Sequence, residues 1–177
     1  MSLHFRLGLP ILGILLMTAC GGGGGGTETP SASGAPAVVS GSPAEASGAE
    51  QTIALEFSNP SGADKILIVQ LMIAPNLSTP KSCWIEYAIA DGTVRMMDGS
   101  GQAKAGEAGS LSNAQCSIDP AQVKSTVAGN SLKMQVRVQL KPSVTDTQNI
   151  FALASAASQH SGWHPVGVWT REGTAAK

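Results

Sequence analysis

Apolar and polar residues alternate along much of the chain after residue 50. The clearest case is Ser131–Leu140, where every second residue from Leu132 to Leu140 is apolar and the residues between them are Lys, Gln or Arg. A period of two residues is typical of a β-strand with one buried face. The same pattern, or a short apolar run, predicts further strands at 52–58, 66–74, 83–90, 93–97, 148–154 and 166–170. Because no helical period continues for twelve residues, the sequence predicts an all-β, antiparallel sandwich of seven or eight strands.

The strand at 83–90 fixes the direction of two residues of interest. Cys83, Ile85 and Tyr87 share one face, which we take to be buried, and Trp84 lies on the opposite face. A tryptophan ring on a sheet surface can hold a sugar ring, so Trp84 is a candidate ligand-facing residue. The alternative is that the face carrying Trp84 is itself covered.

The first nineteen residues have the organisation of an export signal. Arg6 precedes an apolar run from Leu7 to Met17. As a helix this run is only about 16 Å long, too short for a hydrocarbon core of about 30 Å. We therefore predict a signal peptide over residues 1–19 and not a membrane-spanning helix. It ends in Met17-Thr18-Ala19-Cys20, which resembles the lipobox of bacterial lipoproteins, with Met17 where Leu is usual.

The lipobox resemblance implies that Cys20 is lipidated on its thiol, that cleavage occurs before it, and that the new amino terminus is acylated. Several acyl chains make such an anchor effectively permanent. Gly21, in place of Asp, implies the outer membrane, by resemblance to the sorting rule of double-membrane bacteria. The alternative is an ordinary secretory signal with an incidental cysteine, although residues 17–19 offer no A-x-A cleavage site.

Residues 20–50 are expected to form a flexible tether that carries the lipidated cysteine. In residues 21–50, 25 of 30 positions are Gly, Ala, Ser, Pro or Thr. Such a segment buries too little apolar surface to offset the entropy lost on ordering. The sequence therefore predicts one folded domain over residues 51–172 and a short tail at 173–177. Its size and strand number are those of an immunoglobulin-like sandwich.

Charge and cysteine content narrow the partners and the compartment. Residues 51–172 contain nine Lys or Arg and nine Asp or Glu, a balance that excludes a basic nucleic-acid-binding surface. If lipid occupies Cys20, then Cys83 and Cys116 remain to pair in an oxidising compartment. Cys116 shares a face with Ile118, so both sulfurs are expected to point into the core and to join two strands. Their spacing is far from C-x-x-C, which disfavours a redox pair.

Residues that could carry catalysis or bind a metal are few. His160 and His164 lie four apart in a segment interrupted by glycine and proline, and no further Cys or His completes a zinc site. Asp91 and Asp98 bracket a predicted hairpin, and Asp98-Gly99-Ser100-Gly101 hints at an oxygen-rich loop without the calcium-loop spacing. Neither a nucleophile elbow nor a Ser-His-Asp set is evident. We therefore expect no enzymatic activity, no metal and no cofactor.

Short motifs in a fixed order give the domain a second resemblance. They are Phe57-Ser58-Asn59-Pro60-Ser61-Gly62, Val69-Gln70-Leu71-Met72-Ile73, Cys83-Trp84-Ile85-Glu86-Tyr87, Leu111-Ser112-Asn113-Ala114-Gln115-Cys116, Gly129-Asn130-Ser131-Leu132, Leu140-Lys141-Pro142, Gln148-Asn149-Ile150-Phe151, Ser161-Gly162-Trp163 and Gly167-Val168-Trp169-Thr170. The series is similar to an immunoglobulin-like repeat of bacterial secreted and surface multidomain proteins, and it spans almost the whole domain. This chain differs in having a single copy on a lipid tether. The resemblance lends it no enzymatic activity.

These features predict a non-enzymatic, lipid-anchored domain of the bacterial cell envelope with a structural, adhesive or protein-interaction role. Its partners would be the membrane, through the lipid anchor, and an unidentified envelope protein. The alternative is a carbohydrate-binding accessory module that holds an extracellular glycan on Trp84. A catalytic function is a third and remote alternative.

We expect the mature chain to begin at Cys20 and to carry lipid there, because a short apolar run is followed directly by the lipobox-like sequence. Mass spectrometry of the native amino-terminal peptide checks this, since acylation adds a characteristic mass to the peptide. An unmodified peptide that contains Cys20 would contradict the prediction.

Overall fold

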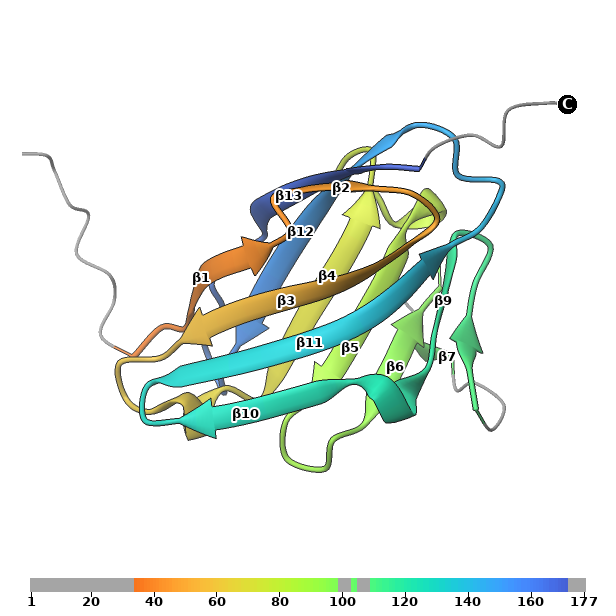
Figure 1. The fold of residues 1–177 in the computed structure, drawn as a ribbon. Coiled ribbons are helices and arrows are strands. Elements are labelled where there is room, and N and C mark those ends of the chain that lie inside the picture. Colours follow the sequence, from red (N-terminus) through yellow and green to blue (C-terminus); the bar gives the residue numbers. More distant parts are fainter. Residues whose placement is uncertain (1–33, 99–102, 105–108, 172–177) are drawn as a thin grey trace, which may run out of the picture.

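The computed structural model describes residues 34–98, 103–104 and 109–171, which form two facing β-sheets (Figure 1). The front layer in Figure 1 is a six-stranded sheet in the order β1-β3-β11-β9-β8, with β10 also paired to β11. Its strands are β1 (Ala37–Ser42), β3 (Glu50–Ser58), β8 (Leu111–Ser112), β9 (Cys116–Ile118), β10 (Lys124–Ala128) and β11 (Ser131–Leu140).

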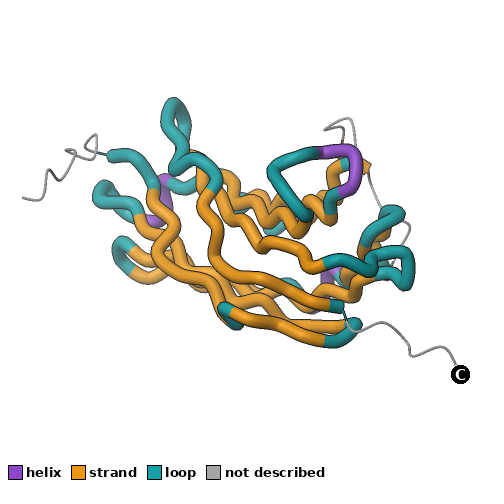
Figure 2. The backbone as a smooth tube through the Cα atoms, turned by 90° about the horizontal axis from the view of Figure 1, so that it is seen from above, coloured by secondary structure: helices purple, strands orange, loops and turns teal. Residues whose placement is uncertain are grey.

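The second layer is a seven-stranded sheet in the order β2-β13-β12-β4-β5-β6-β7. Its strands are β2 (Glu45–Ser47), β4 (Ile68–Ala74), β5 (Cys83–Ala88), β6 (Val94–Met97), β7 (Ala103–Lys104), β12 (Thr147–Ser155) and β13 (His164–Thr170). The described helices are three-residue 3₁₀ turns, η1 (Ala63–Lys65), η2 (Thr79–Lys81) and η3 (Pro120–Gln122), seen in purple in Figure 2. In the described part of the chain, no helix has the length and apolarity needed to cross a membrane.

The core lies between the two sheets and follows the predicted alternation. On β11, Leu132, Met134 and Val136 point inward, and each is paired in register with an inward residue of β3. The seven-stranded sheet adds the inward residues of β4 and β5. Each such side chain contributes roughly 1.5–3 kcal/mol when it is fully removed from water. The prediction of an all-β, immunoglobulin-like sandwich is confirmed.

The strands that the alternation predicts are present, with ends that differ by a few residues. β11 has the predicted bounds, and β12 is one residue longer at each end than predicted. The described residues form thirteen strands, more than the predicted seven or eight. β1 lies in the predicted tether, and β10 was missed because all five of its residues are exposed and show no alternation. β2, β7, β8 and β9 have only two or three residues each, too few to carry a periodicity. β7 lies between residues 99–102 and 105–108, which are outside the described residues.

The predicted tether over residues 20–50 is wrong from Ala37 onward. β1 pairs antiparallel with β3, and β2 pairs parallel with β13, so the chain changes sheets between them (Figure 1). The folded domain therefore begins well before residue 51. Residues 20–33 lie outside the described residues.

The change of sheets requires small residues where the strands approach each other closely. The abundance of small residues in this segment is the reason that a flexible tether was predicted. A Cβ atom on Gly41 would lie 2.6 Å from the Cβ of Val166, and one on Gly167 would lie 2.8 Å from the carbonyl oxygen of Pro43. Separations this short force the backbone apart. The segment is thus ordered by backbone pairing and close approach more than by its own apolar area.

Trp169 of β13 holds the amino-terminal strands in place. Its side chain is fully buried, and it is paired in register with Ala46 of β2 on one side and Gln148 of β12 on the other. Its indole Nε1–H donates to the carbonyl oxygen of Gly48 at 2.8 Å. Gly48 follows β2, so one buried ring ties residues 45–48 to the core.

Replacing Trp169 with Phe should lower the free energy of unfolding by about 2–3 kcal/mol, because it leaves a cavity and deprives the Gly48 carbonyl of its donor. Urea unfolding measures the change. Val168→Ala is the matched control on the same strand, and we expect it to cost less than about 1 kcal/mol. Equal effects of the two substitutions would contradict the anchoring role of Trp169.

Candidate functional site

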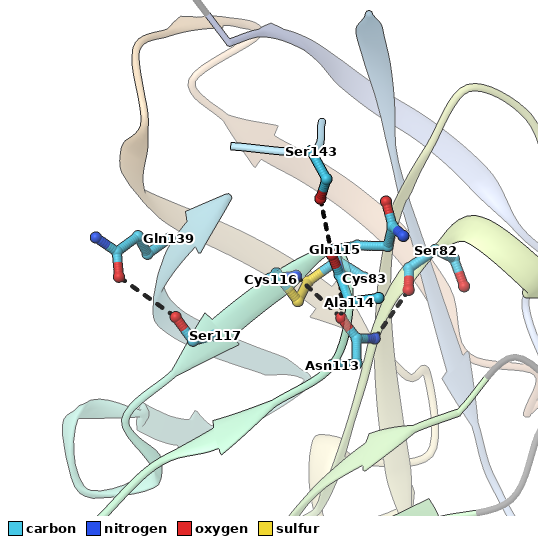
Figure 3. Close-up of a disulfide and its surroundings, with 9 residues drawn as sticks. All are labelled: Ser82, Cys83, Asn113, Ala114, Gln115, Cys116, Ser117, Gln139 and Ser143. Carbon is cyan, nitrogen blue, oxygen red and sulfur yellow. Dashed lines mark hydrogen bonds between the residues drawn. A yellow bond between two sulfur atoms is a disulfide. The ribbon is translucent and has the colours of Figure 1, made fainter. Parts of the chain in front are cut away.

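The Cys83–Cys116 disulfide joins the two sheets. Cys83 is the first residue of β5 in the seven-stranded sheet, and Cys116 is the first residue of β9 in the six-stranded sheet. Their Cα atoms are 5.5 Å apart and both residues are fully buried (Figure 3). The predicted pairing is confirmed, and the two strands are joined across the core as expected.

In addition to the disulfide, hydrogen bonds of the Asn113 side chain link the two segments that carry the cysteines (Figure 3). Its Nδ2 donates to the carbonyl oxygen of Ser82 at 3.0 Å, on the segment that enters β5. Its Oδ1 accepts the backbone N–H groups of Gln115 at 2.8 Å and Cys116 at 2.9 Å. The side chain of Asn113 therefore holds Ser82, which precedes Cys83, close to Cys116. From the sequence, Asn113 was named only as part of a motif. The signal that could have identified it is that an Asn at the start of a turn often hydrogen-bonds to the backbone two residues further on.

Trp84 points away from the core, as the alternation along β5 predicts. It is paired in register with Met72 of β4 on one side and Met97 of β6 on the other. Met72 is paired in turn with Phe151 of β12. These four side chains therefore form one apolar row across the outer surface of the seven-stranded sheet. Trp84 is half-buried, so a part of its ring reaches solvent.

Trp163 packs against Trp84 from the loop between β12 and β13. The two ring centroids lie 6.1 Å apart, with the planes 73° from parallel. Sequence reasoning missed this contact, because the alternation rule does not extend into loops. The indole Nε1 of Trp84 is buried and has no hydrogen-bond partner among the described residues.

The loop that carries Trp163 is held by its own hydrogen bonds. The hydroxyl of Ser161 accepts the N–H of Ala154 at 3.0 Å and donates to the carbonyl of Gly162 at 2.7 Å. Nδ1 of His160 accepts the N–H of Gly162 at 3.0 Å, and Nε2 of His164 donates to the carbonyl of Ser161 at 2.9 Å. Gly162 has a φ of +77°, which favours glycine. The two histidines thus bond to the backbone of the loop that precedes β13.

Two apolar residues of β4 are buried outside the main core. Met72 is only 2 % exposed and Ala74 is fully buried, yet neither belongs to the cluster between the sheets. Both lie on the outward side of β4, opposite the inward Val69, Leu71 and Ile73. The outer surface of the seven-stranded sheet is therefore partly covered and partly open, which lies between the two alternatives for Trp84.

The two outer surfaces of the sandwich differ in chemistry. We call the larger apolar residues on the outward side of the seven-stranded sheet, together with the loop tryptophan, the Trp84 face: Ile68, Met72, Trp84, Met97, Phe151, Leu153, Trp163 and Val168. The opposite surface, on β11, carries Lys133, Gln135, Arg137 and Gln139, all exposed. The outer surface of the seven-stranded sheet also carries the polar residues Gln70, Glu86, Arg95 and Asn149. What distinguishes it from the outward side of β11 is its aromatic and methionine side chains.

Asp91 and Asp98 are the acidic residues considered as calcium ligands, and Asp91 has a local role in a turn. The side chain and the backbone N–H of Thr93 hydrogen-bond to the carboxylate of Asp91 and lower its pKa, within the β5–β6 turn. Of Asp98–Gly101, only Asp98 lies within the described residues. No three His, Cys, Asp or Glu residues come together as metal ligands within the described ranges.

No family model matches this chain, and a search of curated proteins finds no similar protein. Cys20 lies outside the described residues, so its lipidation stays a prediction. The same holds for Trp84 as a ligand-facing residue.

The Cys83→Ala/Cys116→Ala double variant should lose roughly 3.5–4 kcal/mol of stability on the chain-entropy model. The reason is that the bridge closes a ring across a sequence separation of 33 residues. We expect a melting temperature lower by about 10 °C, measured by circular dichroism against the oxidised protein. A shift of less than a few degrees, or free thiols on the protein isolated from the envelope, would argue against a structural bridge.

Proposed function

We propose that this chain is a non-enzymatic, lipid-anchored domain of the bacterial outer membrane that binds another protein through the Trp84 face. Lipid on Cys20 would hold it at the membrane. The role of the sandwich is then structural or adhesive, and the partner is a protein of the envelope or of extracellular material.

The difference between the two outer surfaces is the observation that carries this proposal. Aromatic residues and methionine are enriched in protein interfaces, and contiguous apolar patches on a monomer mark interaction sites. The Trp84 face has three half-buried aromatic side chains, Trp84, Phe151 and Trp163, and the half-buried Met97, on neighbouring strands and one loop, with Met72 buried beside Trp84. The charged surface of β11 provides a natural comparison within the same fold.

The disulfide and the loop hydrogen bonds that hold the Trp84 face also support binding by a preformed surface. Trp84 follows directly after Cys83, so the disulfide fixes the strand from which the ring projects. Trp163 is fixed by the hydrogen bonds of its own loop. A rigid surface loses less conformational entropy on binding than a mobile one.

The pKa shifts of the described residues have local causes at the surface of the molecule. Active sites usually shift the pKa of a group in a cleft. Here the shifts fall on exposed side chains with simple causes. A hydrogen bond from Lys65 lowers the pKa of Asp64, and one to Glu50 raises the pKa of Arg137.

A carbohydrate-binding role is the second candidate, and one group of contacts favours it. Glu86 lies two residues after Trp84 on the same face and accepts hydrogen bonds from Gln70 at 2.9 Å and Arg95 at 3.1 Å. Sugar rings are commonly held by an aromatic surface together with a few polar groups that fix their orientation. The half-buried Trp84 beside this polar group offers both elements.

Site-specific photo-crosslinking in intact cells tests the proposed protein partner. We expect a photoreactive phenylalanine at Phe151, on the Trp84 face, to give a discrete crosslinked band. The same group at Gln139, which lies on the opposite surface and is paired with Ser117 of β9, is the matched control and should give none. Crosslinking of equal strength at both positions, or at neither, would argue against a protein partner on this face.

A glycan array with the purified full chain distinguishes the second candidate. Binding that is lost in Trp84→Ala and kept in Gln135→Ala would favour the carbohydrate role. Crosslinking at Phe151 without glycan binding would favour the protein partner.

A further inference from the structure

β10 is a free edge of the six-stranded sheet. It pairs with β11 on one side, and within the described residues no strand lies on its other side, as its place at the lower margin of Figure 1 shows. All five of its residues, Lys124–Ala128, are exposed. An edge of this kind presents unpaired backbone donors and acceptors to solvent.

The other described edges lack a regular strand of this length. β1 has a register shift between Val38 and Ser40, and β2, β7 and β8 are only two or three residues long. Bulges and short strands protect sheet edges against pairing with other chains. β10 keeps one register with β11 over all five residues, from Lys124↔Gln135 to Ala128↔Ser131. Its only charged residue stands at one end.

The register identifies which backbone groups of β10 are free. The two-residue turn Gly129-Asn130 is closed by the pair Ala128↔Ser131, which exchanges hydrogen bonds in such hairpins. In agreement, the N–H of Asn59 on the other side of β11 donates to the carbonyl of Asn130. Because the pattern alternates, Ser125 and Val127 direct their N–H and C=O groups away from β11.

We propose that β10 pairs antiparallel with β10 of a second copy of this chain, about a two-fold axis through Thr126. Ser125 then exchanges two backbone hydrogen bonds with Val127 of the second copy, and the symmetric pair makes two more. Lys124 lies opposite Ala128 of the second copy, so the two lysines are at opposite ends. Thr126 faces Thr126, a cross-strand pair that stabilises sheets. The two six-stranded sheets become one.

The side chains on the inner side of β10 suit this pairing. The Tyr87 hydroxyl of β5 hydrogen-bonds to the Ser125 hydroxyl at 2.8 Å, which holds the edge strand against the opposite sheet. Val127 is 43 % exposed although its partner Leu132 is fully buried, and a second copy of β10 would cover it. This surface is separate from the Trp84 face, so the inference stands without the proposed function. Anchoring on a membrane would raise the effective concentration of the copies.

Amide hydrogen exchange of the full chain tests the free groups directly. In dilute protein, the amides of Ser125 and Val127 should exchange fast and that of Thr126 slowly. At about 1 mM, exchange at Ser125 and Val127 should slow about tenfold or more, while Thr126 changes little. Exchange that is independent of concentration, together with a monomer in sedimentation at that concentration, would overturn the proposal.

Charge substitutions at the two-fold axis test the register. Thr126→Lys alone and Thr126→Glu alone should each remain monomeric, because like charges would face each other, whereas a mixture of the two should associate. Gln135→Lys, on the neighbouring strand and away from the axis, is the control and should associate like the parent chain. Val127→Pro removes a free N–H and leaves the bonds to β11 intact, so it should also abolish pairing. Association of Thr126→Lys alone, or none in the mixture, would overturn the proposal.

Discussion

The alternation of side-chain direction at residues 83 and 84 is the constraint on which the arrangement of this molecule depends. Cys83 points inward and is bonded to Cys116 of the other sheet, so Trp84 must point outward. The same short strand therefore fastens the two sheets together and displays the ring at the centre of the Trp84 face. A shift of one residue in the register of β5 would bury Trp84 and expose the cysteine. The disulfide link between the sheets and the outward position of Trp84 therefore cannot change independently.

The three tryptophans have different structural roles. Trp169 is buried and binds the amino-terminal strands through Gly48. Trp163 is carried by a loop and covers part of the sheet surface, where it meets Trp84 edge to face. In a chain in which only 4 % of residues are aromatic, these rings mark the positions where distant segments meet. The large area of each ring lets one side chain connect several elements.

The sequence predicted the parts of the fold that depend on periodicity. The strands with clear alternation, the outward direction of Trp84 and the bridge between Cys83 and Cys116 follow from it, because each depends on which face of a strand a residue occupies. The amino-terminal strands were missed because the composition of residues 21–50 predicts flexibility, whereas Gly41 in that segment stabilises the fold by allowing close approach to Val166. The bonds of Asn113 and the contact of Trp163 with Trp84 depend on tertiary positions that a local pattern does not contain.

The central claim is that the bond between the sheets keeps the Trp84 face in its observed form. Nuclear Overhauser contacts between the rings of Trp84 and Trp163, recorded in the oxidised chain and in the Cys83→Ala/Cys116→Ala variant, test it most directly. At a temperature where both proteins are folded, we expect these contacts in the oxidised chain and their weakening in the variant, while contacts of Trp169 persist in both. Equal Trp84–Trp163 contacts in the two proteins would show that the face does not depend on the bridge, and would contradict this account.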